Sequence, residues 1–220
     1  MKTIVITSQK GGSGKTTLAA HLAVEAERVG DTPTWVIDTD KQGTLSLWHD
    51  RRESETPQRA DVPFGRLADG LKMLRDQGAA YCFIDTPPTI SEQSVAVLGL
   101  ADLVLIPVRP SPADLWAVSE TVTLVKEAGK PFLFVITQAK AQASITAQTI
   151  AALSEHGRVA QTFIADRVPY AVAMTGGRTA PELSAKTAAA DEVSALWRDV
   201  KSLFQENMKT MKPLRSVANG

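Results

Sequence analysis

A glycine-rich segment near the beginning of the 220-residue chain combines the residue types that are needed to bind phosphate. The segment, Lys10-Gly-Gly-Ser-Gly-Lys-Thr-Thr17, follows a short apolar run and precedes a helical pattern. Its glycines allow the backbone to turn with N–H groups pointing inward, and the following helix adds the positive end of its dipole. We therefore expect a phosphate-binding loop that is made of Gly11, Gly12, Ser13, Gly14, Lys15, Thr16 and Thr17.

Two side chains of this loop have distinct expected tasks. Lys15 would reach the β- and γ-phosphates of a nucleotide, and the Thr16 hydroxyl would bind Mg²⁺. The common pattern G-x-x-x-x-G-K-[ST] is not met, because Gln9 stands where its first glycine belongs. The structural alternative is a flexible glycine and serine hairpin with solvated lysines. The apolar run before the loop and the helical pattern after it favour the phosphate site.

Carboxylates follow two other apolar runs, in Val36-Ile-Asp-Thr-Asp-Lys-Gln42 and Phe83-Ile-Asp-Thr-Pro-Pro88. Phosphate transfer needs carboxylates that hold Mg²⁺ and orient an attacking water. Because open α/β sheets bind ligands at the carboxyl ends of their strands, both runs are expected to meet the phosphate loop. Two structural alternatives stay open: Asp40 could be a helix N-cap, and Asp-Thr-Pro-Pro could be an ordinary turn.

Short apolar runs alternate with longer helical patterns, which predicts an α/β fold with a single doubly wound, mostly parallel sheet and helices on both faces. The expected strands are Thr3–Thr7, Thr34–Ile37, Ala80–Ile84, Leu103–Pro107, Phe132–Thr137 and Val159–Ile164. The expected helices are Lys15–Val29, Thr44–Arg52, Phe64–Gln77, Glu92–Gly99, Pro112–Ala128, Ser144–Glu155 and Ala188–Met211. The stretches Glu53–Pro63 and Thr175–Thr187 are expected to be loops. Residues 1–212 would form one domain, and residues 213–220 a flexible tail that begins at Pro213.

Composition excludes several classes of protein. The 24 basic and 24 acidic side chains cancel, which argues against a wholly basic nucleic-acid binder but permits a local basic stripe. The single cysteine, Cys82, excludes a disulfide framework or a cysteine-held metal cluster within one chain. No apolar run approaches the ~20 residues of a membrane span, and the apolar N-terminal run is too short for a signal peptide. We expect a cytoplasmic protein.

The motif K-G-G-x-G-K-T-T at Lys10–Thr17 resembles the ParA/MinD family of deviant Walker A P-loop ATPases, and most closely the short ParA partition proteins that lack an N-terminal DNA-binding domain. The resemblance covers about residues 1–200. It implies a P-loop NTPase fold that binds ATP and Mg²⁺ and forms a homodimer on ATP. It also implies that Lys10 crosses the dimer interface to the nucleotide of the other subunit.

The same resemblance assigns roles to three aspartates. The first carboxylate run is similar to the family's D-x-D-P-Q switch, so Asp38 would contact the Mg²⁺ shell and Asp40 would position the hydrolytic water. Asp85 ends the Walker B strand and would bind Mg²⁺ through water. Lys41 occupies the usual proline position, which should loosen the loop and place a cation beside Asp40. The implied catalytic residues are Lys10, Lys15 and Asp40, and the implied metal-binding residues are Thr16, Asp38 and Asp85.

Two later segments resemble the part of the family that binds the base. Ile136-Thr137-Gln138 ends an expected strand where adenine contacts usually arise, and Arg167 to Tyr170, followed by Gly176-Gly177, resembles the region that closes over the base. A purely structural role for both segments is the alternative.

The last expected helix has two different sides. Its apolar residues Val193, Leu196, Val200, Leu203, Phe204 and Met211 share one face at 100° per residue. The opposite side carries the basic residues Arg198, Lys201, Lys209 and Lys212. These either form the charged outer side of a docked helix or contact DNA phosphates. Aromatic residues are few and no helix-turn-helix precedes Met1, so only non-specific duplex binding fits.

Together with these patterns, the resemblance implies a weak ATPase whose ATP-bound dimer holds non-specific DNA and associates with the nucleoid. A ParB-like or other adaptor would stimulate hydrolysis and release it, in plasmid or chromosome partition or in cargo positioning. One alternative is a MinD-like membrane-cycling ATPase, but the C-terminal tail is only weakly apolar and is interrupted by Pro213. The other is a P-loop metabolic synthase, which the three scattered histidines do not favour.

Overall fold

The computed structural model describes residues 1–89, 92–140 and 144–210, except for the side chains of residues 92–93 and 207–210. Its centre is one six-stranded sheet in which all neighbouring strands are parallel, in the order β3-β2-β4-β1-β5-β6. The strands are β1 (Lys2–Ile6), β2 (Thr34–Asp38), β3 (Gln58–Arg59), β4 (Tyr81–Asp85), β5 (Leu103–Val108) and β6 (Phe132–Ile136). The predicted fold class is confirmed.

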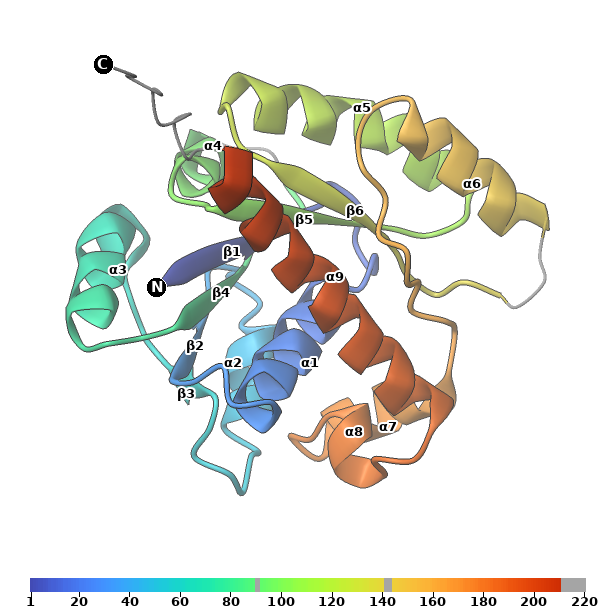
Figure 1. Cartoon of the computed structure of the whole chain (residues 1–220). Coiled ribbons are helices and arrows are strands. Elements are labelled where there is room, and N and C mark those ends of the chain that lie inside the picture. Colours follow the sequence, from blue (N-terminus) through green and yellow to red (C-terminus); the bar gives the residue numbers. More distant parts are fainter. Residues whose placement is uncertain (90–91, 141–143, 211–220) are drawn as a thin grey trace, which may run out of the picture.

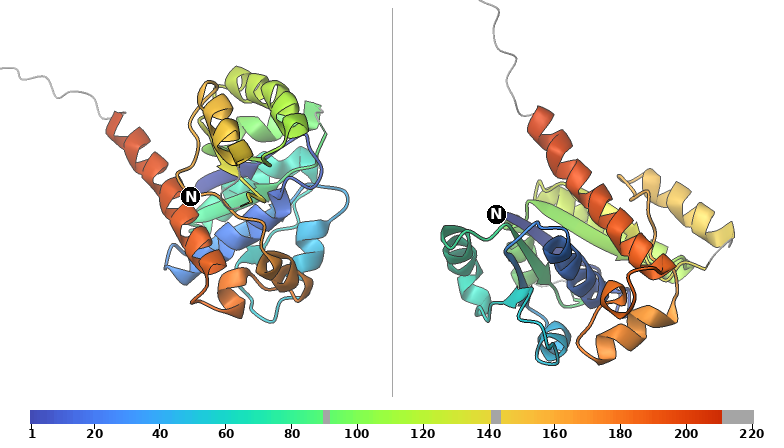
Figure 2. Two further views of the ribbon diagram at one scale, coloured as in Figure 1. Left: turned by 90° about the vertical axis from the view of Figure 1, so that its right-hand side faces the viewer. Right: turned by 60° about the horizontal axis from the view of Figure 1, so that its bottom comes forward.

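Helices cover both faces of the sheet (Figures 1 and 2). One face is packed by α1 (Lys15–Arg28), α2 (Thr44–His49), α7 (Val168–Thr175), α8 (Ala180–Leu183) and α9 (Ala188–Thr210). The other is packed by the 3-10 turn η1 (Phe64–Arg66) and by α3 (Leu67–Asp76), α4 (Glu92–Gly99), α5 (Pro112–Glu127) and α6 (Ser144–Ser154). The central strands supply side chains to both cores, because alternate residues point to opposite faces. In β1, Ile4 and Ile6 belong to the first core and Val5 to the second.

An aromatic cluster fixes the long C-terminal helix over the sheet. Trp197 of α9 is buried, with its ring centroid 4.9 Å from that of Tyr81 and 5.8 Å from that of Phe83. Its indole N–H donates to Asp31 Oδ2 at 2.8 Å, at the exit of α1. Burying an aromatic side chain of this size stabilises the fold by roughly 2–3 kcal/mol, so α9 is an integral part of the domain.

A second junction joins α2 to the segment between α7 and α8. Arg52 donates to the carbonyl oxygen of Gly177 at 2.8 Å and forms an ion pair with Glu182 at 2.8 Å. The same guanidinium stacks on the Trp48 ring at 4.7 Å, and the Trp48 indole N–H donates to the Arg178 carbonyl oxygen. Glu182 also completes a capping box at the start of α8. Segments 130 residues apart in sequence are therefore held as one unit.

The predicted strand Val159–Ile164 is wrong. It forms no continuous ladder: Val159 is bridged to Phe134, Ile164 N–H donates to the Ile136 carbonyl oxygen at 2.9 Å, and a second bridge joins Ala165 to Ala139 beyond the end of β6. Between the bridges the chain leaves the sheet edge, because the Thr162 N–H donates to Asp199 Oδ2 of α9 at 2.9 Å. In a regular strand the Thr162 N–H would donate to β6, but here it donates to a side chain of α9.

Two predicted loops contain regular structure. The stretch Glu53–Pro63 holds the two-residue strand β3, and the stretch Thr175–Thr187 holds the single-turn helix α8. Helix α7 was also not expected as an element. The other predicted strands and helices agree with the structure to within a few residues at their ends. The predicted end of the last helix at Met211 and the predicted tail 213–220 lie outside the described residues.

Candidate functional site

The phosphate loop and both carboxylate runs meet at one edge of the sheet. The loop follows β1, Asp38 is the last residue of β2, and Asp85 is the last residue of β4. The parallel register pairs Asp38 with Asp85 across β2 and β4, and pairs Ile6 with Asp85 across β1 and β4. The three segments therefore leave the sheet side by side, as the sequence predicted.

The backbone of the loop has the conformation that an anion site needs. Gly12 and Gly14 have φ values of +71° and +93°, a region that side-chain-bearing residues rarely adopt. Gly14 is the N-cap of α1, and the first turn of α1 has no acidic residue, so the helix leaves N–H groups for an anion. Gln138 and Thr137, which follow β6, donate to the carbonyl oxygens of Gly12 and Ser13, each at 2.7 Å. The carbonyl oxygens of Gly12 and Ser13 are thus bonded to side chains that follow β6.

Lys15 lies inside this loop with only 7% of its surface exposed. Its ammonium group donates to the Lys10 carbonyl oxygen at a long distance of 3.4 Å. Burial lowers the pKa of Lys15, while the nearby carboxylates of Asp85 and Asp40 act in the opposite direction. An ammonium group has three donors, so this group could also bind phosphate oxygens, and that role of Lys15 stays a prediction.

Asp85 joins the phosphate loop to the sheet. The Thr16 hydroxyl donates to Asp85 Oδ2 at 2.5 Å, and the carboxyl group is 1% exposed. Its other oxygen, Oδ1, is buried with no hydrogen-bond partner in the described part of the chain. Burial raises the pKa of Asp85 from 3.8 to about 7, to which Asp38 and Asp40 add, while Thr16 and Lys15 oppose the rise.

This arrangement fits Mg²⁺. The ion prefers oxygen ligands, keeps several waters, and is usually held by one or two carboxylates together with substrate phosphates. The free oxygen of Asp85 and the Thr16 hydroxyl supply protein oxygens beside the loop. Among the described residues there is no group of three or more His, Cys, Asp or Glu that could hold a metal alone.

The second aspartate of the switch does not cap α2. The N-cap of α2 is Gly43, with φ +64°, and the N–H of Ser46 in the first turn is bound by Asp38 Oδ2 at 2.9 Å. Asp38 Oδ1 accepts from the Asp40 N–H at 3.0 Å. Asp40 accepts from the Gln42 N–H through Oδ1 at 3.0 Å, in a local turn. The N-cap alternative for Asp40 is wrong, and the residue remains at the site edge near Lys15.

The pH dependence of folding should report the burial of Asp85. Because the pKa of Asp85 is raised in the folded state, the folded chain keeps a proton that the unfolded chain has released. Without ligands, the free energy of unfolding should therefore fall by about 2–4 kcal/mol as the pH rises from about 4 to 7. Urea unfolding at several pH values measures this. The Asp85→Asn variant should lose this pH-dependent change in unfolding free energy. An identical pH profile for the variant and the wild type would contradict the raised pKa of Asp85.

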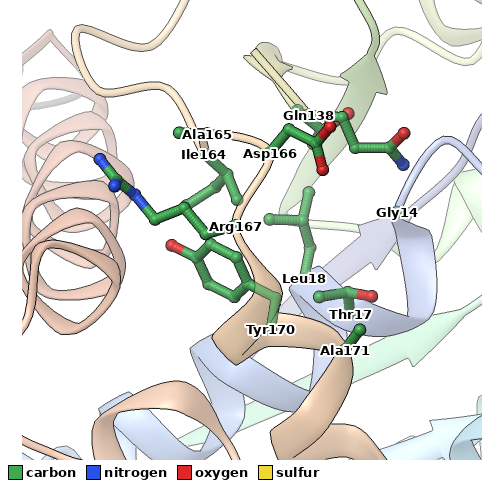
Figure 3. Close-up of a pocket in the computed structure, with 11 residues that line it drawn as sticks. Gly14, Thr17, Leu18, Gln138, Ile164, Ala165, Asp166, Arg167, Tyr170 and Ala171 are labelled. Atoms are coloured by element: carbon green, nitrogen blue, oxygen red, sulfur yellow. The ribbon is translucent and has the colours of Figure 1, made fainter. Parts of the chain in front are cut away.

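A pocket of about 230 Å³ opens next to the loop (Figure 3). Gly14, Thr17 and Leu18 form one side of it, Thr137 and Gln138 follow β6, and the remaining wall comes from the segment that holds Ile164, Ala165, Asp166, Arg167, Tyr170 and Ala171. The two segments predicted to surround a base are thus brought together beside the phosphate loop. No ligand contact tests that assignment, which remains a prediction.

One wall of the pocket is attached to α9 through a single carboxylate that the sequence did not single out. Glu192 accepts from the Tyr170 hydroxyl at 2.7 Å, from Arg167 at 2.8 Å and from the Ala165 N–H at 3.2 Å. Figure 3 shows Arg167 and the Tyr170 hydroxyl directed toward this helix. The Tyr170 ring also contacts His21 of α1 edge-on, at 5.2 Å between centroids. The only sequence signal was an acidic residue beside the apolar face of α9.

The predicted basic stripe on α9 is only partly available. Arg198 is exposed, but Lys201 donates to Asp31 Oδ2 at 2.8 Å and lies over the Trp197 ring. The side chain of Lys209 and the whole of Lys212 lie outside the described residues. DNA binding by this stripe stays a prediction, and Arg198 is its best-defined member. Separately, none of the helices in the described ranges is long and apolar enough to cross a bilayer.

Known proteins match the chain over most of its length. A model of the CobQ/CobB/MinD/ParA nucleotide binding domain matches residues 4–217. The maintenance of carboxysome distribution protein A of Halothiobacillus neapolitanus is 28% identical over 211 residues, which cover 90% of this chain and 95% of that protein. The ParA protein of Rhizobium radiobacter is 30% identical over 131 residues, covering 58% and 57%.

A solved structure has the same fold. The septum site-determining protein MinD of Pyrococcus horikoshii, solved with Mg-ADP, aligns with a TM-score of 0.77 at 16% identity. The alignment covers 92% of this chain and 97% of the other.

Proposed function

Because the chain belongs to the CobQ/CobB/MinD/ParA nucleotide-binding family, we propose that it is a Mg²⁺-dependent ATPase that acts as a nucleotide-controlled switch. The observation that carries the proposal is the contact of the Thr16 hydroxyl with Asp85, whose second oxygen is buried and unpaired. Asp85 would then bind Mg²⁺ beside the phosphate loop. Lys15 would neutralise the β- and γ-phosphates, and Mg²⁺, when bound, would draw charge from the terminal phosphate.

Dimerisation on ATP is the second part of the proposal. The Lys10 backbone is used within the loop, since its carbonyl oxygen accepts from Lys15 and its N–H donates to Ser8. Its half-buried side chain would then reach the nucleotide of a second copy. Each nucleotide site would then be complete only in the dimer. Dimerisation would therefore depend on the γ-phosphate.

Hydrolysis would end the dimeric state. Asp40 would orient the attacking water, while Asp38 holds the start of α2 and the backbone of Asp40 together. Turnover by the isolated protein should be slow, because phosphate transfer of this kind relies on complete charge neutralisation. A ParB-like or other adaptor that inserts a cation could raise the rate by roughly 10³–10⁵-fold, as activating proteins do for related nucleotide switches.

The ATP dimer would hold non-specific DNA and thereby associate with the nucleoid of the cytoplasm. Its task would be to segregate a plasmid or chromosome or to position a cargo. Both are consistent with the relatives, because one is named for carboxysome distribution and another is ParA. The exposed Arg198 side chain, doubled by dimerisation, would contribute to the DNA contact.

A gel-shift experiment with random duplex tests this proposal. Binding should require ATP and Mg²⁺ and should weaken by roughly 10³-fold between about 50 and 200 mM salt if six or more phosphates are contacted. Arg198→Ala removes two contacts per dimer, so the slope of log K against log salt should become shallower by about 2.

The matched control is Arg75→Ala, which removes an exposed arginine of α3 on the opposite face of the sheet. Its slope should equal that of the wild type. Failure of the wild type to bind duplex with ATP would end the DNA part of the proposal. ATP-dependent sedimentation with anionic liposomes would instead indicate a membrane-cycling ATPase. Release of ADP that requires a small-molecule substrate would indicate a synthase.

A further inference from the structure

Arg109 follows β5 and brings a third cation to the phosphate loop. A side-chain carbon built on Gly12 would lie 3.6 Å from Arg109 Nη1, so this nitrogen faces the loop at Gly12. One third of the Arg109 side chain remains exposed. The loop is therefore flanked by Lys10, Lys15 and Arg109, and only the two lysines are part of the glycine-rich motif.

A buried carboxylate holds the guanidinium in one orientation. Asp114 of α5 accepts from Arg109 Nε and Nη2, both at 2.9 Å, in a bidentate pair, and its side chain is 3% exposed. Ser111, the N-cap of α5, also donates to Asp114 at 3.0 Å. Burial would raise the pKa of Asp114, but these hydrogen bonds lower it below its ordinary value, so the residue stays ionised.

The geometry of the pair decides which edge of the guanidinium is available. Both nitrogens on the Asp114 side are used, and Nη1 is the nitrogen that faces Gly12. Gln138 donates a hydrogen bond to the Gly12 carbonyl oxygen from another direction. The Gly12 carbonyl oxygen is therefore already bonded, and within the described part of the chain the remaining Arg109 N–H groups have no acceptor, which leaves them available to a ligand oxygen.

The position of Gly12 along the loop indicates which phosphate group Arg109 would bind. The base pocket borders Gly14 and Thr17, at the end of the loop that enters α1. Gly12 precedes these residues, next to Lys10 and away from the helix. A triphosphate that extends from the pocket past Lys15 would place its terminal group toward this side.

We propose, on the premise of ATP binding stated above, that Arg109 is a third cation of the triphosphate site and that its Nη1 edge binds the γ-phosphate. Asp114 is the positioning residue, because it fixes the guanidinium without touching the ligand. A planar, permanently charged group held in this way is suited to phosphate oxygens, and lysine cannot reproduce both contacts at once.

Nucleotide affinities separate this role from a purely structural one. Fluorescent ATP and ADP analogues are titrated with Mg²⁺ at protein concentrations where light scattering finds only monomer. In Arg109→Gln the affinity for the ATP analogue should fall by roughly 10–100-fold, as expected for a lost charge-assisted bond, with little change for the ADP analogue. Arg109→Lys and Asp114→Asn should each lose part of this preference for ATP.

Arg28→Gln is the control, because Arg28 forms the same kind of bidentate pair with Glu25 at the far end of α1. Its affinities for both analogues should equal those of the wild type. Equal losses of ATP and ADP affinity in Arg109→Gln would show that Arg109 only braces the loop and would overturn the proposal, as would no loss for either. A wild type that binds neither analogue would instead contradict the proposed ATPase function.

Discussion

Asp40→Ala should abolish most ATP hydrolysis and leave the protein as a stable ATP-bound dimer. The carboxylate lies close enough to Lys15 and Asp85 to influence the pKa of both, and its described hydrogen bond uses only Oδ1. Removing a group that orients the attacking water typically costs roughly 10²–10⁴-fold in rate. The phosphate loop itself is unchanged, so ATP should still bind.

Size-exclusion chromatography with light scattering measures the outcome. With ATP and Mg²⁺, Asp40→Ala should elute as a dimer and remain so, whereas the wild type should return to monomer as ATP is consumed. Adding Lys10→Ala to Asp40→Ala should restore the monomer, because the contact between subunits is lost. An Asp40→Ala protein that binds ATP but stays monomeric at every concentration would contradict the switch.

Among the glycine-to-alanine substitutions, Gly177→Ala should lower the stability of the fold the most. Gly177 has φ +68°, and an added Cβ would lie 2.5 Å from the carbonyl carbon of Arg51 and 2.6 Å from the backbone nitrogen of Arg52. These are backbone atoms of the segment that follows α2, so they cannot rotate away. Strain and overpacking together should cost about 3 kcal/mol of unfolding free energy or more, and lower the Tm by roughly 6–12 °C.

Gly176→Ala provides the matched comparison one residue earlier. Gly176 has negative φ, and the nearest atom to its Cβ would be the Ala173 carbonyl oxygen at 4.0 Å. Thermal unfolding followed by circular dichroism should show little change for this variant. If both substitutions had the same small effect, the close packing of the Gly177 segment on α2 would be wrong.

The phosphate loop and its carboxylates could be predicted because their information is local. Each lies within a few residues of a buried strand, and the parallel order of β1, β2 and β4 brings the strand ends together. The loop glycines at Gly12 and Gly14 have the positive φ values that the motif requires. The hydrophobic pattern likewise gave most strands and helices.

Features that depend on distant partners could not be predicted. Arg109 lies far from Gly12 in the sequence, and only the fold brings the two residues together. Lys201 looked like a free cation because its partner, Asp31, lies 170 residues away. The two-residue strand β3 has too little sequence for any periodicity. In Val159–Ile164 an apolar pattern was outweighed by the hydrogen bond from Thr162 to Asp199.

The register of the sheet has a consequence for how this site can move. Asp38 and Asp85 occupy paired positions on neighbouring hydrogen-bonded strands, so the distance between their backbones equals the spacing of strands, about 4.8 Å. Changing that distance would require breaking the central sheet, whereas the loops that follow both residues can rearrange at little cost. We therefore expect successive rounds of ligand exchange to reshape the loops around two anchor points that remain stationary.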